Sequence, residues 1–293
     1  MIRKAVKENV GRDPDFIGIG PPKCATSWLD QVLRTHPGIF MPKDRKEVFF
    51  FTKYYNRGTD WYRGIFADAG AEQICGEISP SYIRKSGGIA IERIAQYKSD
   101  IKLVAIFRHP LDRAFSLYAM NRENAKYSYD FSEALDRHER LHEGSNYSAH
   151  LEKLMHHFDP AQLHIMIYEE LFADHAETLQ HLDALAQFLG VEAGQMDPMA
   201  ISGPVRKMRG EPRFPRLVSC MNRVQTAMKD ANMDWLIQLL RKGELDRRLL
   251  YRNTHSALKP DDQEYRQLAQ RFEPDIQAVE DYLGRRIPAW HTD

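Results

Sequence analysis

Lys23, Thr26 and Ser27 form a closely spaced group of one cation and two hydroxyls just after Gly20. The apolar run 16–19 before them is typical of a buried strand, and a helical pattern begins directly after them. A strand that turns tightly into a helix leaves backbone N–H groups unpaired at the turn, and the positive end of the helix dipole adds to their field. The segment therefore predicts an anion site, usually one for phosphate.

The order of these residues differs from that of the nucleoside-triphosphate P-loop. That motif requires Gly-x-x-x-x-Gly-Lys-Ser/Thr, whereas here Lys23 precedes the hydroxyls and has no glycine beside it. The lysine-before-hydroxyl order indicates a different kind of phosphate loop.

Arg108 and Ser116 are the second group with the chemistry of an anion site. Arg108 ends an apolar run typical of a buried parallel strand, and ligands of open α/β sheets bind at the carboxyl ends of strands. Ser116 lies two helical turns further on, in a predicted helix, so a guanidinium and a hydroxyl can hold a second phosphate together. Alone, the pair would be a strand-end charge in water and a surface serine. Two such sites on one sheet favour phosphate binding.

Strand-like and helix-like patterns alternate along the chain, which is typical of a parallel α/β sheet with right-handed crossovers. The predicted fold is α/β, with a central parallel sheet flanked by helices and a helical C-terminal part, in a single domain covering 1–293. Residues 1–14 are expected to be a flexible N-terminal segment and 195–216 a long loop. The predicted strands are 16–19, 38–42, 74–80, 102–108 and 163–168, and the predicted helices are 27–35, 89–97, 111–120, 147–158, 178–189 (closed by Gly190) and much of 235–282.

Composition limits the classes of partner. Lys+Arg and Asp+Glu are both 41, so the formal net charge is zero and bulk electrostatics do not predict binding to nucleic acid or to an anionic membrane. The sequence has no apolar run of transmembrane length, and 1–9 is polar and mixed in charge, unlike a signal peptide. We therefore expect a cytoplasmic protein of ordinary globular composition with no membrane span.

The cysteines and histidines do not predict a metal site. Cys24, Cys75 and Cys220 are too scattered for a zinc site or a disulfide framework and are expected to be buried or half-buried. Cys24 is the exception of interest, because a thiol beside a lysine near a helix start can have a lowered pKa. The histidines at 109, 138, 142 and 150 do not have the spacing of a ligand set and are expected to be structural or solvent-facing, with His150 a candidate for lining an acceptor cleft.

Several motifs together resemble the sulfotransferases that use 3′-phosphoadenosine-5′-phosphosulfate (PAPS). The segment 22–29 resembles the family's 5′-phosphosulfate loop, Pro-Lys-x-Gly-Thr-Thr/Ser-x-Leu, and 108–118 resembles its 3′-phosphate motif, Arg-x-Pro-x-x-Arg-x-x-Ser-x-Tyr. The similarity extends to 46–51, 76–82, 168–171 and the tail 283–290, and so covers most of the chain. The Lys-Glu-x-x-Phe-Phe element is similar to the heparan-sulfate and Golgi carbohydrate branch and its bacterial relatives.

The resemblance implies a P-loop-like sulfotransferase fold and sulfuryl transfer from PAPS, with PAP as the product and no metal required. Lys23 would stabilise the leaving phosphate oxygen and Glu47 would be the general base. The acceptor would be a hydroxyl of a carbohydrate, glycolipid or natural product, with Glu77, Tyr82 and His150 as candidate substrate-binding residues. The cofactor-binding residues would be Lys23, Cys24, Ala25, Thr26, Ser27, Trp28, Arg108, Ser116, Arg206, Lys207, Arg209 and Gly210, the last four in the loop expected to cover the cofactor.

The sequence departs from the family pattern at two positions. Ala25 replaces the glycine of the phosphate loop, so the turn must tolerate a Cβ atom there. Ile78 stands where several heparan-type enzymes have a lysine, which puts binding of a polyanionic acceptor in doubt. Basic residues 206–209 could equally form an exposed loop with no role in binding.

Two other functions fit part of the pattern. A P-loop kinase or nucleotide hydrolase would need a glycine-lysine pair and an acidic residue at a strand end to hold Mg²⁺, but the central strand ends in Arg108. A non-catalytic nucleotide-binding module would share the phosphate sites without the chemistry. The acceptor and the oligomeric state cannot be read from the sequence.

Overall fold

The structure is a computed structural model that describes residues 11–84, 89–200, 211–230, 251–252, 258 and 260–291. The chain forms two compact units. The first contains 1–113, 143–205 and 272–293, and the second contains 114–142 and 206–271. Their assignment to one functional domain stays a prediction.

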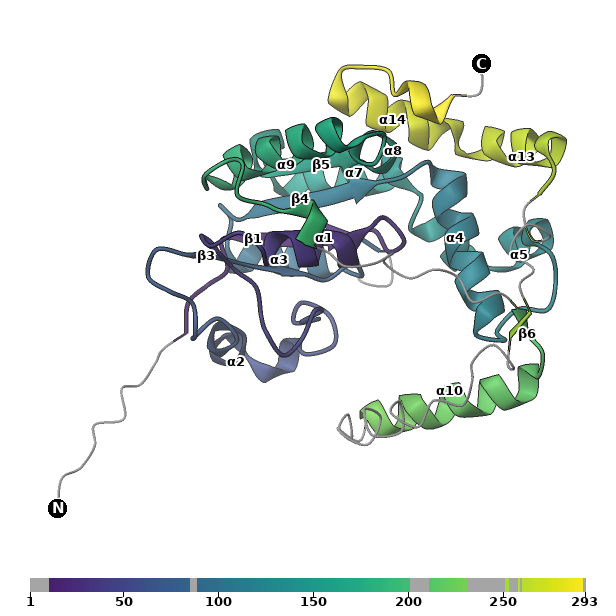
Figure 1. The fold of residues 1–293 in the computed structure, drawn as a ribbon, viewed down its shortest axis with the longest axis horizontal. Coiled ribbons are helices and arrows are strands. Elements are labelled where there is room, and N and C mark those ends of the chain that lie inside the picture. Colours follow the sequence, from purple (N-terminus) through teal and green to yellow (C-terminus); the bar gives the residue numbers. More distant parts are fainter. Residues whose placement is uncertain are drawn as a thin grey trace. The chain divides into compact units, whose positions relative to one another are not determined.

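The first unit is built on a five-stranded parallel sheet, as Figure 1 shows. The strand order is β2-β3-β1-β4-β5, so β1 lies at the centre with β3 and β4 as its neighbours. The strand residues are almost all buried, which explains the continuous apolar runs in the sequence. The predicted α/β class and the central parallel sheet are confirmed. The strands are β1 (Phe16–Gly20), β2 (Ile39–Phe40), β3 (Ile74–Ile78), β4 (Lys102–Phe107) and β5 (Leu163–Ile167).

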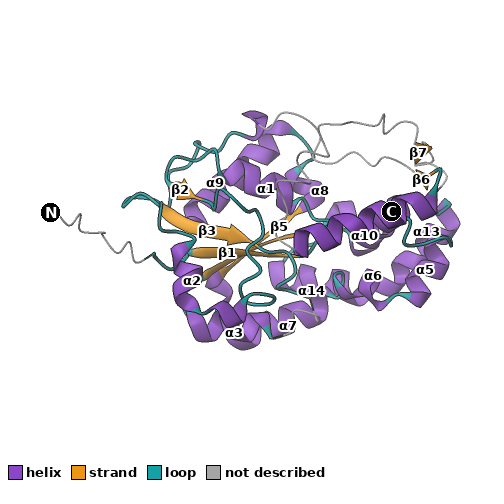
Figure 2. Ribbon diagram, turned by 90° about the horizontal axis from the view of Figure 1, so that it is seen from below, coloured by secondary structure: helices purple, strands orange, loops and turns teal. Residues whose placement is uncertain are grey.

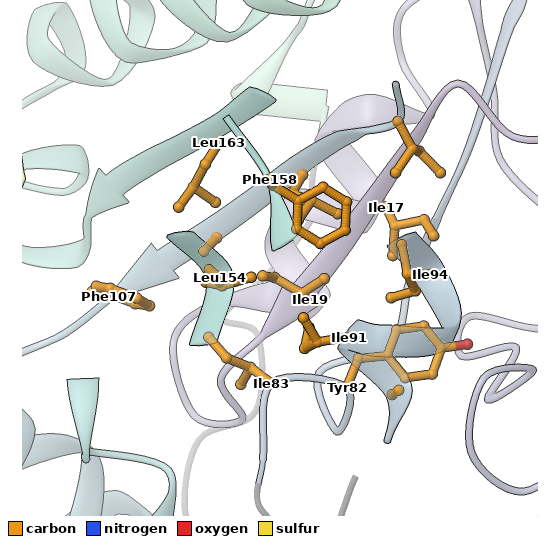
Figure 3. Close-up of a cluster of buried hydrophobic side chains, with 14 of the residues drawn as sticks. Ile17, Ile19, Tyr82, Ile83, Ile91, Ile94, Phe107, Leu154, Phe158 and Leu163 are labelled. Carbon is orange, nitrogen blue, oxygen red and sulfur yellow. The ribbon is translucent and has the colours of Figure 1, made fainter. Parts of the chain in front are cut away.

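Helices cover both faces of this sheet (Figure 2). Alternate strand side chains point to opposite faces, so Ile17 and Ile19 enter one apolar cluster while Phe16 enters the other. Figure 3 shows the first cluster, in which Leu154 and Phe158 lie near Ile19. The helices of this first face are α2 (Thr59–Gly64), α3 (Ala90–Tyr97), α7 (Tyr147–His157) and α14 (Glu273–Leu283), and those of the second are α1 (Thr26–Leu33) and α9 (His175–Leu189).

The remaining elements of the first unit are short. The helix α8 (Tyr168–Leu171) follows β5 directly, and Gly190 ends α9 in the left-handed conformation, as its position after a long helix predicts. The single-turn helices of this unit are η1 (Tyr55–Arg57), η3 (Pro160–Gln162), η4 (Pro198–Ala200) and η7 (Pro288–Trp290).

The second unit is mainly helical. Its core includes Tyr118, whose ring lies 5.3 Å from that of Phe131 and whose hydroxyl donates to the carbonyl of Tyr129 at 2.8 Å. The chain passes from the first unit into this one within α4 (Pro110–Glu123) and returns at the end of α6 (Glu139–Glu143). The other elements are α5 (Phe131–Arg137), β6 (Glu211–Pro212) paired antiparallel with β7 (Tyr251–Arg252), α10 (Pro215–Asp230), α13 (Asp262–Ala269) and η6 (Gln270–Phe272).

Three sequence predictions fall partly outside the described residues. Residues 1–10 of the N-terminal segment 1–14, which was expected to be flexible, lie outside them, whereas Asp13 of that segment accepts a hydrogen bond from Arg63 at 2.7 Å. The described ends of the expected loop 195–216 contain η4, β6 and the first residues of α10, and its cofactor-covering role stays a prediction. Of the helical portion expected within 235–282, the described part confirms α13 and α14. Among the described helices, none has the length and apolar character needed to cross a membrane.

Candidate active site

The turn between β1 and α1 has the backbone conformation of an anion-binding loop. Gly20 has a φ of +109°, and a Cβ atom there would come within 2.3 Å of the carbonyl oxygen of Pro80, so only glycine fits. Lys23 (φ 78°) and Ala25 (φ 53°) are both left-handed, and turns of this kind gather N–H groups into an anion-binding concavity. The N–H groups of Thr26 and Ser27 accordingly have no hydrogen-bond acceptor in the described part of the chain.

The loop accommodates Ala25 at the position of the family's glycine. Its left-handed conformation is the one that glycine adopts without strain, so the Cβ atom is tolerated at a conformational cost. Trp28 packs into the second apolar cluster and its ring meets that of Phe172 edge-on at 4.9 Å. Lys23 and Ser27 are half-buried and Thr26 is buried.

The expectation of a lowered pKa for Cys24 is wrong. The thiol is fully buried, and burial raises its pKa to about 12 although the positive charges of Arg113 and Arg108 act in the opposite direction. Cys24 is therefore a neutral core side chain beneath the loop. Cys75 is also buried, Cys220 is exposed, and all three are free thiols.

Arg108 lies immediately after β4, beside the end of β1 that carries the phosphate loop. Its guanidinium stands over the ring of Tyr168 with the carbon Cζ 4.6 Å from the ring centroid. The Nε atom of Arg108 is buried and has no hydrogen-bond partner among the described residues. The backbone is held by the Tyr147 hydroxyl, which donates to the Arg108 carbonyl at 2.7 Å and accepts from its N–H at 3.3 Å. The guanidinium is thus held on the face of the Tyr168 ring, and among the described residues its Nε–H group has no hydrogen-bond acceptor.

Glu169 fixes the segment that follows Arg108. One carboxylate oxygen accepts from the backbone N–H of His109 at 3.0 Å, and the other accepts from the indole N–H of Trp290 at 2.7 Å. Burial raises the pKa of Glu169, while these hydrogen bonds and the charge of Arg108 act to lower it. The motifs around 168–171 and 283–290 indicated a family likeness but not this supporting role for their side chains.

Ser116 belongs to a different compact unit from Arg108, and the predicted cofactor-covering residues lie outside the described residues. Ser116 is a half-buried residue in the second turn of α4, within the second compact unit, whereas Arg108 belongs to the first. Their joint binding of one phosphate stays a prediction. The four residues predicted to cover the cofactor, Arg206, Lys207, Arg209 and Gly210, lie outside the described residues.

Glu47 lies next to the phosphate loop through its neighbour Lys46. The Nζ atom of Lys46 donates to the hydroxyl oxygen of Ser27 at 2.6 Å and lies 3.6 Å from the Oε1 atom of Glu47. The Glu47 side chain is 33% exposed, so a molecule from solvent can reach its carboxylate. Two residues predicted from separate motifs, Ser27 and Glu47, are thus joined by Lys46, for which the sequence predicted no role.

A buried carboxylate, Glu77, holds the segment that carries Glu47. Glu77 is fully buried and accepts from the hydroxyls of Tyr62 (2.8 Å), Tyr82 (2.9 Å) and Ser79 (2.6 Å). Burial raises the pKa of Glu77, and the hydroxyl donors act in the opposite direction. The oxygen of Ser79 in turn accepts from two consecutive N–H groups, those of residues 48 and 49, each at 3.1 Å. These bonds fix the backbone directly after Glu47.

The structure places all three candidate substrate-binding residues in the interior. Glu77 and Tyr82 belong to the buried network just described, and His150 is buried with its Nε2 atom 2.8 Å from the carbonyl oxygen of Glu143. Burial lowers the pKa of His150 to about 4. Contact of these residues with substrate stays a prediction. No group of three His, Cys, Asp or Glu side chains within the described ranges is arranged to hold a metal ion.

A family model described as a sulfotransferase domain matches residues 13–215, which include the phosphate loop, Glu47 and Arg108. The chain belongs to the sulfotransferase family. The predicted family assignment is therefore confirmed, and the match spans the central sheet as well as the candidate site.

Human relatives in this family act in heparan sulfate modification according to their names. The chain is 30% identical over 201 residues to bifunctional heparan sulfate N-deacetylase/N-sulfotransferase 3 of Homo sapiens, covering 61% of this chain and 22% of that protein. It is 31% identical over 193 residues to heparan sulfate glucosamine 3-O-sulfotransferase 5 of Homo sapiens, covering 61% of this chain and 54% of that protein. The matches thus span about a fifth and about half of the lengths of these two sulfotransferases.

The fold is also that of a solved bacterial sulfotransferase. A sulfotransferase from Alicyclobacillus acidocaldarius superposes with a TM-score of 0.67 at 20% identity, and the match covers 95% of this chain and 99% of that chain. This likeness confirms the predicted sulfotransferase fold.

Proposed function

We propose that this sulfotransferase moves a sulfuryl group from PAPS to a hydroxyl group of a carbohydrate, glycolipid or natural product. The observation that carries the proposal is the position of three features in one compact unit. The phosphate loop and Arg108 follow neighbouring parallel strands, and Lys46 links the loop to Glu47. Ligands of parallel sheets bind at this edge, where the carboxyl ends of the strands meet.

The residues at this edge fit a donor with two separated anionic groups. Within the described part of the chain, the N–H groups of Thr26 and Ser27 have no acceptor and suit the 5′-phosphosulfate. The stacked Arg108, whose Nε atom has no partner in that part either, suits the 3′-phosphate. When bound, PAPS supplies the sulfuryl group and departs as PAP.

Lys23 and Glu47 have complementary tasks in this proposal. Lys23, in the middle of the loop, stabilises the negative charge that develops on the phosphate oxygen as its bond to sulfur breaks. Glu47 accepts the proton that the acceptor hydroxyl loses as its oxygen bonds to sulfur. Lys46 keeps the carboxylate beside Ser27, which sets the base next to the loop.

Two observations bear on the class of the acceptor. The human relatives named above are heparan sulfate enzymes, which supports a carbohydrate acceptor. However, Ile78 is a fully buried core residue at the position where several heparan-type enzymes have lysine, so that cation is missing here. We therefore keep the acceptor as a hydroxyl of a sugar, lipid or natural product.

Incubation with labelled PAPS and a panel of hydroxyl acceptors tests the proposal. We expect a mass gain of one sulfate group on an acceptor and stoichiometric release of PAP. Activity is expected to survive EDTA, because lysine and arginine side chains rather than a metal ion meet the donor's charges. Absence of PAP binding in a calorimetric titration would contradict the proposal.

A further inference from the structure

An arginine–aromatic cluster follows the segment that carries Glu47. The rings of Tyr54 and Trp61 lie 5.7 Å apart, and the guanidinium of Arg57 stands over both, 4.8 Å from the first centroid and 4.9 Å from the second. The guanidinium of Arg45 lies 5.5 Å from the Trp61 centroid. These four residues all belong to the first compact unit.

In the part of the chain that the structure describes, the two arginines of the cluster have no carboxylate partner. Arg45 and Arg57 are exposed, and neither forms an ion pair with any carboxylate of the described residues. By contrast, Arg63 nearby pairs with Asp13 at 2.7 Å and with Asp60 at 3.8 Å. A guanidinium stacked on a ring keeps the N–H groups at its edge available for an oxyanion.

The cluster is adjacent to the predicted base. Arg45 precedes Glu47 by two residues, so their Cα atoms are at most about 7 Å apart. Lys46, between them, contacts Ser27 of the phosphate loop, whereas Arg45 contacts Trp61. Glu47 therefore lies in a segment whose Lys46 contacts the phosphate loop and whose Arg45 belongs to the arginine–aromatic cluster.

We infer that this cluster binds the acceptor, and that the acceptor carries a negatively charged group on or beside a flat ring. The ring would lie against Trp61 and Tyr54, and the oxyanion would accept hydrogen bonds from Arg57 and Arg45. The inference rests on the proposed function, because Glu47 is placed there as the base. Beyond the proposed function, we infer that the acceptor is negatively charged and that these residues select it.

Matched neutral and anionic probes test the inference in the PAP-loaded protein. The first set is para-hydroxybenzyl alcohol, para-hydroxybenzoate and para-hydroxybenzenesulfonate, which separates a carboxylate from a sulfonate. The second is para-nitrophenyl glucoside against para-nitrophenyl glucuronide. In a calorimetric titration we expect an anionic member of a set to bind at least about tenfold more tightly than its neutral counterpart, which corresponds to about 1.4 kcal/mol.

Variants then assign the preference to the cluster. Arg57→Gln is expected to remove the preference for the anionic probe, and Arg57→Lys to restore part of it, because the charge returns without the planar fork. Trp61→Ala should weaken the neutral and anionic probes alike. Lys43→Gln is the matched control, since it removes an exposed charge from the same segment outside the cluster. Retained PAP binding shows that each variant is folded.

Three results would overturn the inference. The first is equal affinity for neutral and anionic probes, or no binding of either. The second is an unchanged preference for the anionic probe in Arg57→Gln. The third is a loss of this preference in the Lys43→Gln control as large as that in Arg57→Gln. Failure of the proposed function has a different signature, namely no binding of PAP to the unmodified protein. The titrations can then be repeated without PAP, and they still decide whether the cluster selects an anionic probe.

Discussion

The two sides of the candidate site are held in place by different means. The phosphate loop is shaped by its own backbone, with Gly20, Lys23 and Ala25 all at positive φ within six residues. The segment of Glu47 is instead fixed by hydrogen bonds that its backbone N–H groups donate to the hydroxyl oxygen of Ser79, which lies 31 residues from the first of these groups. The conformation of the loop therefore depends on a few adjacent residues, whereas the position of the Glu47 segment also depends on a residue far along the chain.

The difference also concerns charge. On the donor side, Arg108 is stacked on an aromatic ring, and its Nε atom has no hydrogen-bond partner among the described residues. On the side of the base, Glu47 is next to Lys46, and the carboxylate that organises the segment, Glu77, is hidden in the core. Substitutions on the donor side should therefore affect cofactor binding or leaving-group stabilisation, and those on the other side should affect proton transfer.

The largest effect is expected from Lys23→Ala. Loss of a cation that stabilises charge developing in the transition state typically costs about a hundredfold to a thousandfold in kcat. We expect a loss at the upper end of this range in PAPS-dependent transfer, measured with saturating acceptor, while calorimetry still detects PAP. Lys43→Ala, an exposed lysine, is the control and should leave kcat unchanged. Full activity of Lys23→Ala would remove the loop lysine from the mechanism.

Glu47→Gln should give the next largest effect. Without a carboxylate to accept the proton of the acceptor hydroxyl, kcat should fall about a hundredfold, at the lower end of general-base contributions. The affinity for PAP should be unchanged, because the donor is held by the phosphate loop and Arg108. If PAP affinity fell and kcat did not, Glu47 would belong to the donor side and the division between the two sides would be wrong.

Ser79→Ala tests whether the segment of Glu47 is positioned from a distance. The change removes the hydroxyl oxygen that accepts from the N–H groups of Val48 and Phe49, and it removes the hydroxyl that donates to one oxygen of Glu77. The expected result is a fall in kcat of about tenfold with an unchanged KM for PAPS, together with about 1–3 kcal/mol lower stability. Ser79→Thr keeps the hydroxyl and should restore kcat. A purely structural role would lower stability without this selective effect on kcat.

Glu77 should also make the stability of the protein depend on pH. Burial raises its pKa in the folded protein above the usual 4.5, so the folded state binds the proton more tightly than the unfolded chain. The resulting stabilisation is fully present below pH 4.5 and is lost as the pH rises through the folded pKa. In Glu77→Gln, urea unfolding across this range should lack that decline, which is at most about 1.4 kcal/mol per pH unit. Parallel curves for the two proteins would contradict the assignment.

The sequence predicted the features that depend on neighbouring residues. The five strands of the central sheet were predicted because each is a mainly apolar run, and the phosphate loop was predicted because its chemistry lies within a few residues. The pKa of Cys24 was predicted wrongly, since burial under the loop cannot be read from the adjacent lysine. The network of Glu77, Ser79 and Val48 was not predicted, because it joins segments about 30 residues apart. The short helix Thr59–Gly64, which packs its Tyr62 ring on Phe50, was not predicted either.

Ala25→Gly should have the smallest effect on stability and PAP affinity. The direction of this effect tests whether the backbone alone sets the conformation of the phosphate loop. The left-handed conformation of Ala25 costs about 1 kcal/mol for a residue with a Cβ atom and almost nothing for glycine. Glycine loses more conformational entropy on folding, which offsets part of this gain. We expect chemical denaturation to show stability raised by at most about 1 kcal/mol and PAP affinity unchanged or slightly higher. A clear loss of PAP affinity would mean that the loop needs the Cβ atom to remain in its binding conformation, so that its shape would not be set by the backbone alone.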